Sequence, residues 1–97
     1  MDAQVALDLL SEHKAAMRLR FGVRKLAIFG SVARGDAVGA SDLDVLVEFV
    51  DRPTFDNYMG LKLYLEGLAR MKVDLAIKGD LRPALRERIE REALNVP

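Results

Sequence analysis

The 97-residue sequence predicts one small domain of the α+β class, a sandwich in which a mixed sheet of three or more strands is flanked by about four helices. Apolar residues at three- and four-residue spacing, typical of helices, alternate along the chain with short apolar runs and with runs in which every second residue is apolar. The length suits a single hydrophobic core, which usually spans about 50–200 residues. Because no repeat, low-complexity tract or linker interrupts the pattern, residues 1–97 are treated as a single domain.

The first half of the chain is predicted to run helix, strand, short helix, strand. Residues 3–20 have one apolar face at helical spacing, and the glycine that follows Phe21 is typical of a helix end. Residues 24–29 form an apolar run between two glycines, which indicates a strand buried on both faces. A short helix over residues 31–37, a turn over residues 37–40 and an alternating strand over residues 42–50 are expected next.

The second half of the chain is predicted to continue with helix, strand, helix. Thr54 suits the capping position of a helix over residues 55–70, in which leucines recur at helical spacing. Residues 73–77 alternate in hydrophobicity and predict a third strand. After a turn at Gly79, a last helix is expected over residues 82–93, with its proline tolerated in the first turn.

Composition and charge argue against several classes of protein. Fifteen acidic and fifteen basic residues leave no net charge, so the basic surface of a duplex-binding protein is missing and no stable binding to nucleic acid is expected. No apolar run approaches the ~18–20 residues of a membrane span, so no membrane association is expected. The absence of cysteine excludes disulfides and thiolate metal sites, and it fits a reducing cytoplasm, the expected location.

Two aspartates are predicted to share one face of the strand over residues 42–50. Asp42 and Asp44 are two residues apart, so their carboxylates leave the same face with their backbones roughly 6–7 Å apart. Such like charges repel each other, and a hard divalent cation such as Mg²⁺ would relieve the repulsion. Asp74, on the next predicted strand, adds a third carboxylate if the two strands are neighbours. The simpler alternative is an exposed strand face that happens to carry acids.

A Gly-Ser pair stands where the first predicted strand turns into the short helix. Gly30 allows close approach of a ligand to the backbone, and the free N–H groups at this point suit an anion. The hydroxyl of Ser31 can hold a phosphate oxygen, although it can also simply cap the helix. Carboxylates beside a phosphate-binding turn are the layout of metal-assisted phosphoryl or nucleotidyl transfer. The pattern is not a P-loop, because no lysine follows Gly35.

Together these residues resemble a known family. Residues 30–35 (GSVARG), a five-residue gap and residues 41–47 (SDLDVLV) resemble the pattern G-S-x-A-R-G-x₅-S-D-x-D-x-L-V of the minimal nucleotidyltransferases, which belong to the DNA polymerase β-like nucleotidyltransferase superfamily. Residues 73–75 resemble the family's third carboxylate segment, and residues 81–96 resemble its terminal helix. The resemblance covers nearly the whole chain and implies the nucleotidyltransferase fold.

The resemblance also implies roles for individual residues. It implies a site for two Mg²⁺ ions formed by three carboxylates, Asp42, Asp44 and Asp74. Asp74 would in addition help to deprotonate the attacking hydroxyl. Gly30 and Ser31 would grip the triphosphate of ATP, the substrate. Arg34 would lie near the phosphates or the partner protein, with a surface salt bridge as the equal alternative.

The expected partner is a HEPN-domain toxin, because the resemblance is to the antitoxins of HEPN toxin–antitoxin pairs and the 97 residues leave no domain for binding an acceptor. The expected function is Mg²⁺-dependent transfer of AMP from ATP to a tyrosine of that toxin, within a hetero-oligomer. Two alternatives stay open: an antitoxin that acts by binding alone, and the catalytic subunit of a two-chain small-molecule nucleotidyltransferase. Four residues are candidate partner contacts, although core packing is favoured for each taken singly: Met17, Phe21, Tyr58 and Met59.

Overall fold

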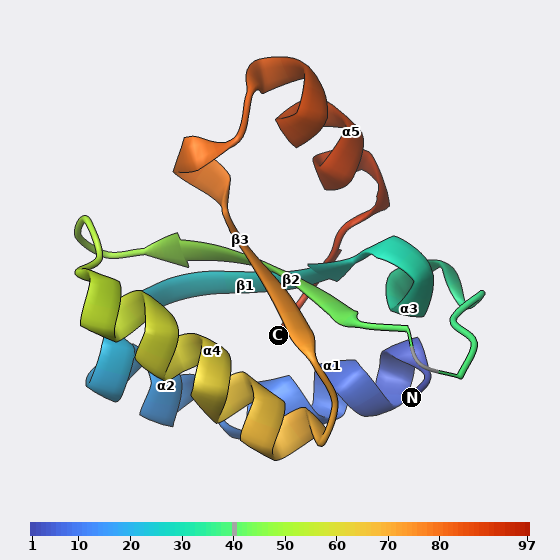
Figure 1. Cartoon of the computed structure of the whole chain (residues 1–97), viewed down its shortest axis with the longest axis horizontal. Helices are drawn as coiled ribbons and strands as arrows, with labels where there is room; N and C mark the ends of the chain where they lie inside the picture. The colour runs from blue at the N-terminus through green and yellow to red at the C-terminus, as the bar shows by residue number, and fades with distance from the viewer. Residues whose placement is uncertain (40) are drawn as a thin grey trace.

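The centre of the molecule is a four-stranded mixed sheet. A computed structural model describes residues 1–39 and 41–97, and Ala40 of the predicted turn lies outside the described residues. The strands are β1 (Val23–Phe29), β2 (Leu43–Phe49), β3 (Val73–Ile77) and β4 (Leu94–Asn95). Their order across the sheet is β3-β2-β1-β4, with β1 antiparallel to β2 and β4, and β2 parallel to β3 (Figure 1). The predicted α+β class is therefore confirmed.

Helices cover both faces of this sheet, as Figure 1 shows. On one face lie α1 (Ala3–Glu12), α2 (Lys14–Phe21) and α4 (Phe55–Ala69), and on the other lies α5 (Pro83–Glu92). The short α3 (Gly30–Arg34) begins directly at the end of β1, and a 3₁₀ helix η1 (Lys78–Asp80) follows β3. Among the described residues, no helix has the length and apolar character that crossing a membrane requires.

The helix predicted over residues 3–20 is in fact two helices that meet at His13. The ring nitrogen Nδ1 of His13 lies 3.0 Å from the carbonyl oxygen of Leu9, the group that the backbone N–H of His13 would bond in an unbroken helix. That N–H donates instead to Leu10, 3.2 Å away, so α1 ends there. The short strand β4 was not predicted, because a strand of two residues has no detectable periodicity.

The main core lies between the sheet and helices α1, α2 and α4. Alternation along β2 is as predicted: Leu43, Val45 and Val47 are fully buried in this core, and the residues between them face α5. Met17 is also fully buried, which confirms core packing, the role favoured for it, and excludes it as a partner contact. Phe21 and Tyr58 pack partly buried against the same core.

The outer edge of β3 is held by two side chains of α4. The hydroxyl of Tyr58 donates a hydrogen bond to the carbonyl of Leu75, and Glu66 Oε2 accepts one from the N–H of Val73 at 3.0 Å. Both backbone groups belong to the edge strand, where unpaired groups would otherwise invite another chain. These contacts fix β3 along its length and therefore fix the position of Asp74.

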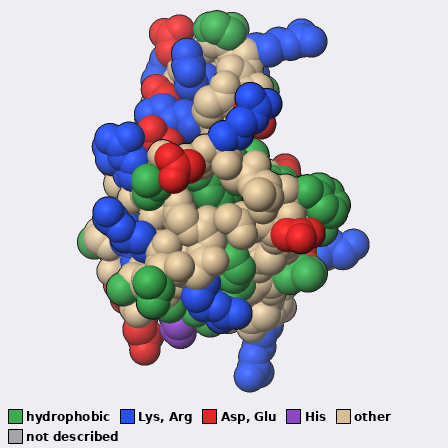
Figure 2. Space-filling model, turned by 90° about the vertical axis from the view of Figure 1, so that its left-hand side faces the viewer, with side chains coloured by type: hydrophobic (Ala, Val, Ile, Leu, Met, Phe, Trp, Pro, Cys, Tyr) green, Lys and Arg blue, Asp and Glu red, His purple; other side chains and the backbone are tan. Residues whose placement is uncertain are grey.

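Helix α5 is attached to the sheet through a second and smaller apolar cluster. Ile89 packs on Ala27 and Leu46, and partly buried apolar residues surround these three. Most of the remaining α5 surface is charged, and Figure 2 shows acidic and basic side chains gathered over this end of the molecule, at the top of the view. One isoleucine therefore provides most of the hydrophobic attachment of α5.

We expect Ile89→Ala to lower the free energy of unfolding by about 2 kcal/mol, near the low end for isoleucine because the cluster is small. Urea unfolding followed by circular dichroism measures the change. The matched control is Leu85→Ala, because Leu85 lies on the same helix but is 42% exposed. Its effect should stay within about 0.5 kcal/mol. Equal losses in the two variants would show that Ile89 does not anchor the helix.

Candidate active site

Two aspartates lie side by side on the face of the sheet that α5 covers in part. The parallel register of β2 and β3 pairs Asp44 with Asp74, so the strand neighbourhood on which the third carboxylate depends is present. Both side chains share their face with Leu46 and Ala76, which are two residues further along each strand. Asp42 precedes β2 by one residue and is exposed.

The carboxylate of Asp44 is held in an unfavourable charged state. Partial burial raises its pKa above the ordinary 3.8, and the negative charges of Asp74 and Asp42 raise it further. The ion pairs found among the described residues leave out all three of these aspartates. The acids are therefore near one another, and no basic side chain among the described residues forms an ion pair with them.

Gly30 fits the site because it has no side chain. Its φ angle is +71°, a conformation that L side chains rarely adopt. A Cβ atom at this position would stand 2.0 Å from Asp44 Oδ2, far inside van der Waals contact. The glycine at the end of β1 and the aspartate on β2 are thus packed directly against each other. The Gly-Ser turn and the carboxylates are distant in the sequence but adjacent in the fold.

Ser31 lies inside the first turn of α3 and does not cap it. The residue that precedes the helix is Phe29, and its side chain makes no capping bond. The simpler alternative for Ser31, a helix cap, is therefore wrong. The backbone carbonyl of Ser31 accepts a hydrogen bond from the N–H of Asp36 at 3.0 Å, which closes the chain after α3.

Arg34 and Glu92 form an ion pair beside these residues. Arg34 Nη1 is 3.2 Å from Glu92 Oε2, and Arg34 Nε is 3.2 Å from Asp36 Oδ2, so the surface salt bridge, one of the two roles considered for Arg34, is present. Arg34 is also near enough to Asp44 for its positive charge to lower the pKa of that carboxyl, whereas Glu92 raises it. Glu92 Oε1 in addition accepts a hydrogen bond from the N–H of Gly30 at 3.0 Å. Sequence reasoning missed Glu92, because nothing in its helix distinguishes it from Glu87 or Glu90.

The donor set suits a hard cation that is shared with a substrate. Asp42, Asp44 and Asp74 offer only carboxylate oxygens, and the charge of Asp44 is poorly compensated. Within residues 1–39 and 41–97, no three acidic, histidine or cysteine side chains converge closely enough to hold one ion by themselves. Mg²⁺ commonly takes only one or two protein carboxylates and completes its shell with water and substrate phosphates. The acidic residues fit that mode of binding.

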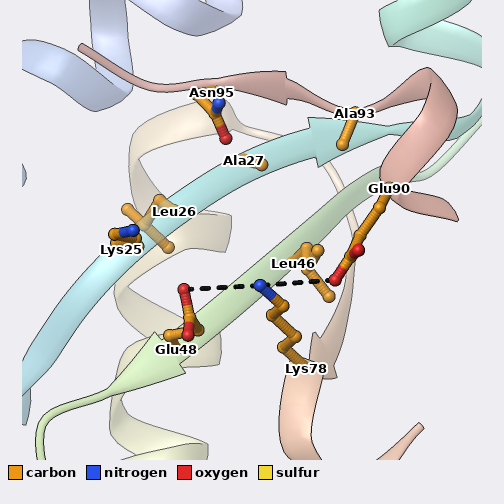
Figure 3. A pocket seen from close by; sticks show the side chains of 9 residues that line it. All are labelled: Lys25, Leu26, Ala27, Leu46, Glu48, Lys78, Glu90, Ala93 and Asn95. Atoms are coloured by element: carbon orange, nitrogen blue, oxygen red, sulfur yellow. Dashed lines mark ion pairs between the residues drawn. The ribbon is translucent and has the colours of Figure 1, made fainter. Parts of the chain in front are cut away.

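A cavity of about 270 Å³ opens on the same face, at the other end of β2. Its floor includes Ala27 and Leu46, and its rim carries Lys78 between Glu48 and Glu90, at 3.9 and 3.3 Å (Figure 3). Lys78 is thus already paired with two carboxylates, and neither of the paired aspartates lines the cavity. The carboxylate pair beside Gly30 is therefore the better candidate for an active site.

Comparison with known proteins identifies the family. Residues 10–96 match the nucleotidyltransferase domain family. The chain is 40% identical to protein adenylyltransferase MntA of Thermococcus cleftensis over 89 residues, which cover 92% of this chain and 90% of that protein. A solved structure assigned to the minimal nucleotidyltransferases is 41% identical and superposes with a TM-score of 0.81 over 97% of this chain and 95% of its own.

A more distant structure shares the fold. A chain from the complex of tri-AMPylated HEPN toxin with MNT antitoxin, from Shewanella oneidensis, is 16% identical and has a TM-score of 0.68. The match covers 94% of this chain and 71% of that one. The fold predicted from the resemblance is thereby confirmed, and the chain belongs to the nucleotidyltransferase domain family as a minimal nucleotidyltransferase.

Proposed function

We propose that this chain transfers AMP from ATP, with Mg²⁺, to a tyrosine hydroxyl of a HEPN-domain toxin and acts as the antitoxin of that toxin. The observation that carries the proposal is the pairing of Asp44 with Asp74 directly beside Gly30. The adenylyltransferase activity that names the Thermococcus relative supports the reaction. The toxin–antitoxin complex in which the same fold occurs supports the partner.

In this proposal, one group of residues binds the phosphates of ATP and another binds the metal. The backbone N–H of Gly30 and the hydroxyl of Ser31 donate hydrogen bonds to phosphate oxygens, and the guanidinium of Arg34 adds positive charge beside them. Asp42, Asp44 and Asp74 would hold Mg²⁺ jointly with water and the substrate phosphates, and the metal would supply positive charge to offset the triphosphate and the departing pyrophosphate.

The transfer itself exchanges one bond to phosphorus for another. The tyrosine oxygen forms a bond to the α-phosphorus of ATP, and the bond from that phosphorus to the oxygen bridging to the β-phosphorus breaks. Pyrophosphate leaves with the electron pair of the broken bond. Asp74 accepts the proton of the tyrosine hydroxyl, a role open to a carboxylate that faces the reacting atoms from the neighbouring strand.

The acceptor comes from a second protein. Asp42 and Asp74 are exposed and Asp44 is half-buried, so a second protein can reach the carboxylates from solvent. Presenting a tyrosine there is left to the partner, so we propose a hetero-oligomer. Orientation of the two reactants contributes several kcal/mol to such a transfer, about 7–11 kcal/mol in the best cases. The chain alone should therefore be nearly inactive.

Transfer of label tests this function. The purified chain is incubated with ATP labelled at the α-phosphate and with Mg²⁺, in the presence and absence of a candidate HEPN-domain partner. We expect label to enter a tyrosine of the partner, and Asp74→Asn to slow this by about 10²–10⁴-fold through loss of the proton acceptor. Asp80→Asn, which changes an exposed acid of η1, is the matched control and should leave transfer unchanged.

Two outcomes would contradict the proposal. Full neutralisation of the toxin by Asp74→Asn, without label in the toxin, would indicate an antitoxin that acts by binding alone. Rapid labelling of an aminoglycoside by the isolated chain would indicate a small-molecule nucleotidyltransferase.

A further inference from the structure

The carboxylate of Glu92 occupies donors that the proposed function assigns to nucleotide phosphates. Glu92 Oε1 accepts the hydrogen bond of the Gly30 N–H at 3.0 Å. Its second oxygen, Oε2, lies 3.2 Å from Arg34 Nη1. Glu92 is the last residue of α5, so this contact joins the C-terminal helix to the Gly-Ser turn.

A phosphate and a carboxylate compete for such donors. Both are anions that form short, charge-assisted hydrogen bonds with backbone N–H groups and with arginine. Gly30 has a single N–H, which cannot bond fully to Glu92 and to a phosphate oxygen at once. The negative charge of Glu92 also adds to that of Asp42, Asp44 and Asp74, so it opposes the approach of an anionic nucleotide.

The attachment of α5 to the sheet does not rest on Glu92 alone. Helix α5 is attached through Ile89 and the apolar residues around it. The side chain of Glu92 is 31% exposed, so its carboxylate can turn towards solvent while the helix stays in place. The contact can therefore open without unfolding of α5.

We propose that Glu92 is an internal competitor of the nucleotide. Its carboxylate must leave the Gly30 N–H and Arg34 before the triphosphate binds there, and this exchange weakens the affinity for ATP. The inference rests on the proposed function, because it takes Gly30 and Arg34 as phosphate ligands. It assigns to α5 a direct influence on nucleotide binding, in addition to its place in the fold.

Binding of MgATP to the chain, measured by isothermal titration calorimetry, tests the competition. Glu92→Gln keeps the size of the side chain and removes its charge. We expect the dissociation constant for MgATP to fall about tenfold, which corresponds to about 1.4 kcal/mol. The matched control is Glu87→Gln, which removes the same charge from the same helix and breaks only the exposed pair with Arg91. The dissociation constant of this control for MgATP should stay within about twofold of the value for the unchanged chain.

A double-mutant cycle with Arg34→Gln separates competition from a general change of charge. If Glu92 competes in part by holding Arg34, the gain from Glu92→Gln should shrink in the Arg34→Gln background. The backbone amide signal of Gly30 in a ¹⁵N-correlated NMR spectrum gives a second readout. It should shift in Glu92→Gln before any nucleotide is added, and it should hardly move in Glu87→Gln.

The outcomes separate this inference from the proposed function. Equal affinity of the unchanged chain and Glu92→Gln for MgATP would overturn the competition and leave the nucleotide site in place. Weaker binding by Glu92→Gln would overturn it as well, since Glu92 would then support the turn. Failure of both proteins to bind MgATP would overturn the proposed function, and the competition with it.

Discussion

Replacing Asp44 with asparagine should abolish AMP transfer and, without metal, make the chain more resistant to unfolding. The neutral amide of the new side chain would be a weaker ligand for Mg²⁺, and the charge stabilisation that a bound metal supplies is worth several kcal/mol. A loss of about 4 kcal/mol corresponds to about a thousandfold lower rate. The gain in stability has a separate cause, because the substitution removes a partly buried charge that Asp74 and Asp42 repel.

The gain in stability should depend on pH in a defined direction. The pKa of Asp44 is raised in the folded chain, chiefly by burial and then by its acidic neighbours, so the folded chain holds this proton more tightly than the unfolded chain does. The two proteins should therefore unfold alike below pH 3.8, the ordinary value. The difference in favour of Asp44→Asn should open as the pH rises through the raised pKa and should persist at neutral pH.

Thermal unfolding in the presence of a chelator measures this difference, and Asp51→Asn, at an exposed acid just after β2, is the control that should show none. Added Mg²⁺ should stabilise the unchanged chain more than Asp44→Asn, because a ligand stabilises the state that binds it. A metal-free Asp44→Asn protein that is less stable than the unchanged chain at neutral pH would contradict the unfavourable charge of Asp44. Full transfer activity in that variant would contradict its role in the site.

Gly30→Val should damage both the fold and the binding of ATP. The new Cβ would stand 2.0 Å from Asp44 Oδ2, and valine would have to adopt a φ of +71°. Backbone strain and overpacking cost about 1–3 kcal/mol each, so we expect a loss of about 2–6 kcal/mol in the free energy of unfolding. Gly35→Val isolates the strain, because Gly35 also has a positive φ, of +81°, but nothing lies within 4 Å of its Cβ position.

Ser31→Ala should weaken ATP binding less than Gly30→Val does. It removes one hydrogen bond to a charged group, worth about 1.5–3 kcal/mol, and should leave the fold intact. Titration with MgATP and urea unfolding of the three variants distinguish the effects. Equal destabilisation by Gly30→Val and Gly35→Val would mean that the contact with Asp44 adds nothing. Unchanged ATP affinity in both Gly30→Val and Ser31→Ala would place the nucleotide elsewhere.

The sequence was sufficient to predict the elements of the fold where periodicity is strong. The strands predicted at residues 42–50 and 73–77 are present, with ends within a residue of the prediction. Thr54 caps its helix as predicted, and its side chain accepts a hydrogen bond from the N–H of Asn57. The helix break at His13 could not be predicted, because it depends on a contact between the ring nitrogen Nδ1 of His13 and the carbonyl oxygen of Leu9.

The candidate site was only partly predictable for a related reason. Local spacing indicates which acids share a strand face, but it carries no information on which distant residues fold back onto them. The pairing of Asp44 with Asp74 could be stated only as a condition, since strand order is decided by packing of the whole sheet. Glu92 was missed because its contacts with Gly30 and Arg34 depend on how α5 packs on the sheet, which the local sequence does not show. Met17 was favoured as a core residue but could not be excluded as a partner contact, because a methionine on an amphipathic helix has the same pattern whether its face meets the core or a partner.

The two side chains of α4 that hold the edge of β3 also determine on which face of the sheet Asp74 lies, although α4 itself covers the other face. A slip of β3 by one residue would turn Asp74 to the opposite side of the sheet, since side chains alternate along a strand. Tyr58 and Glu66 oppose such a slip from the opposite face of the sheet, through hydrogen bonds to the two residues that flank Asp74. Laboratory evolution of this enzyme should therefore find changes of rate in α4, and a screen confined to residues around the substrate would overlook them.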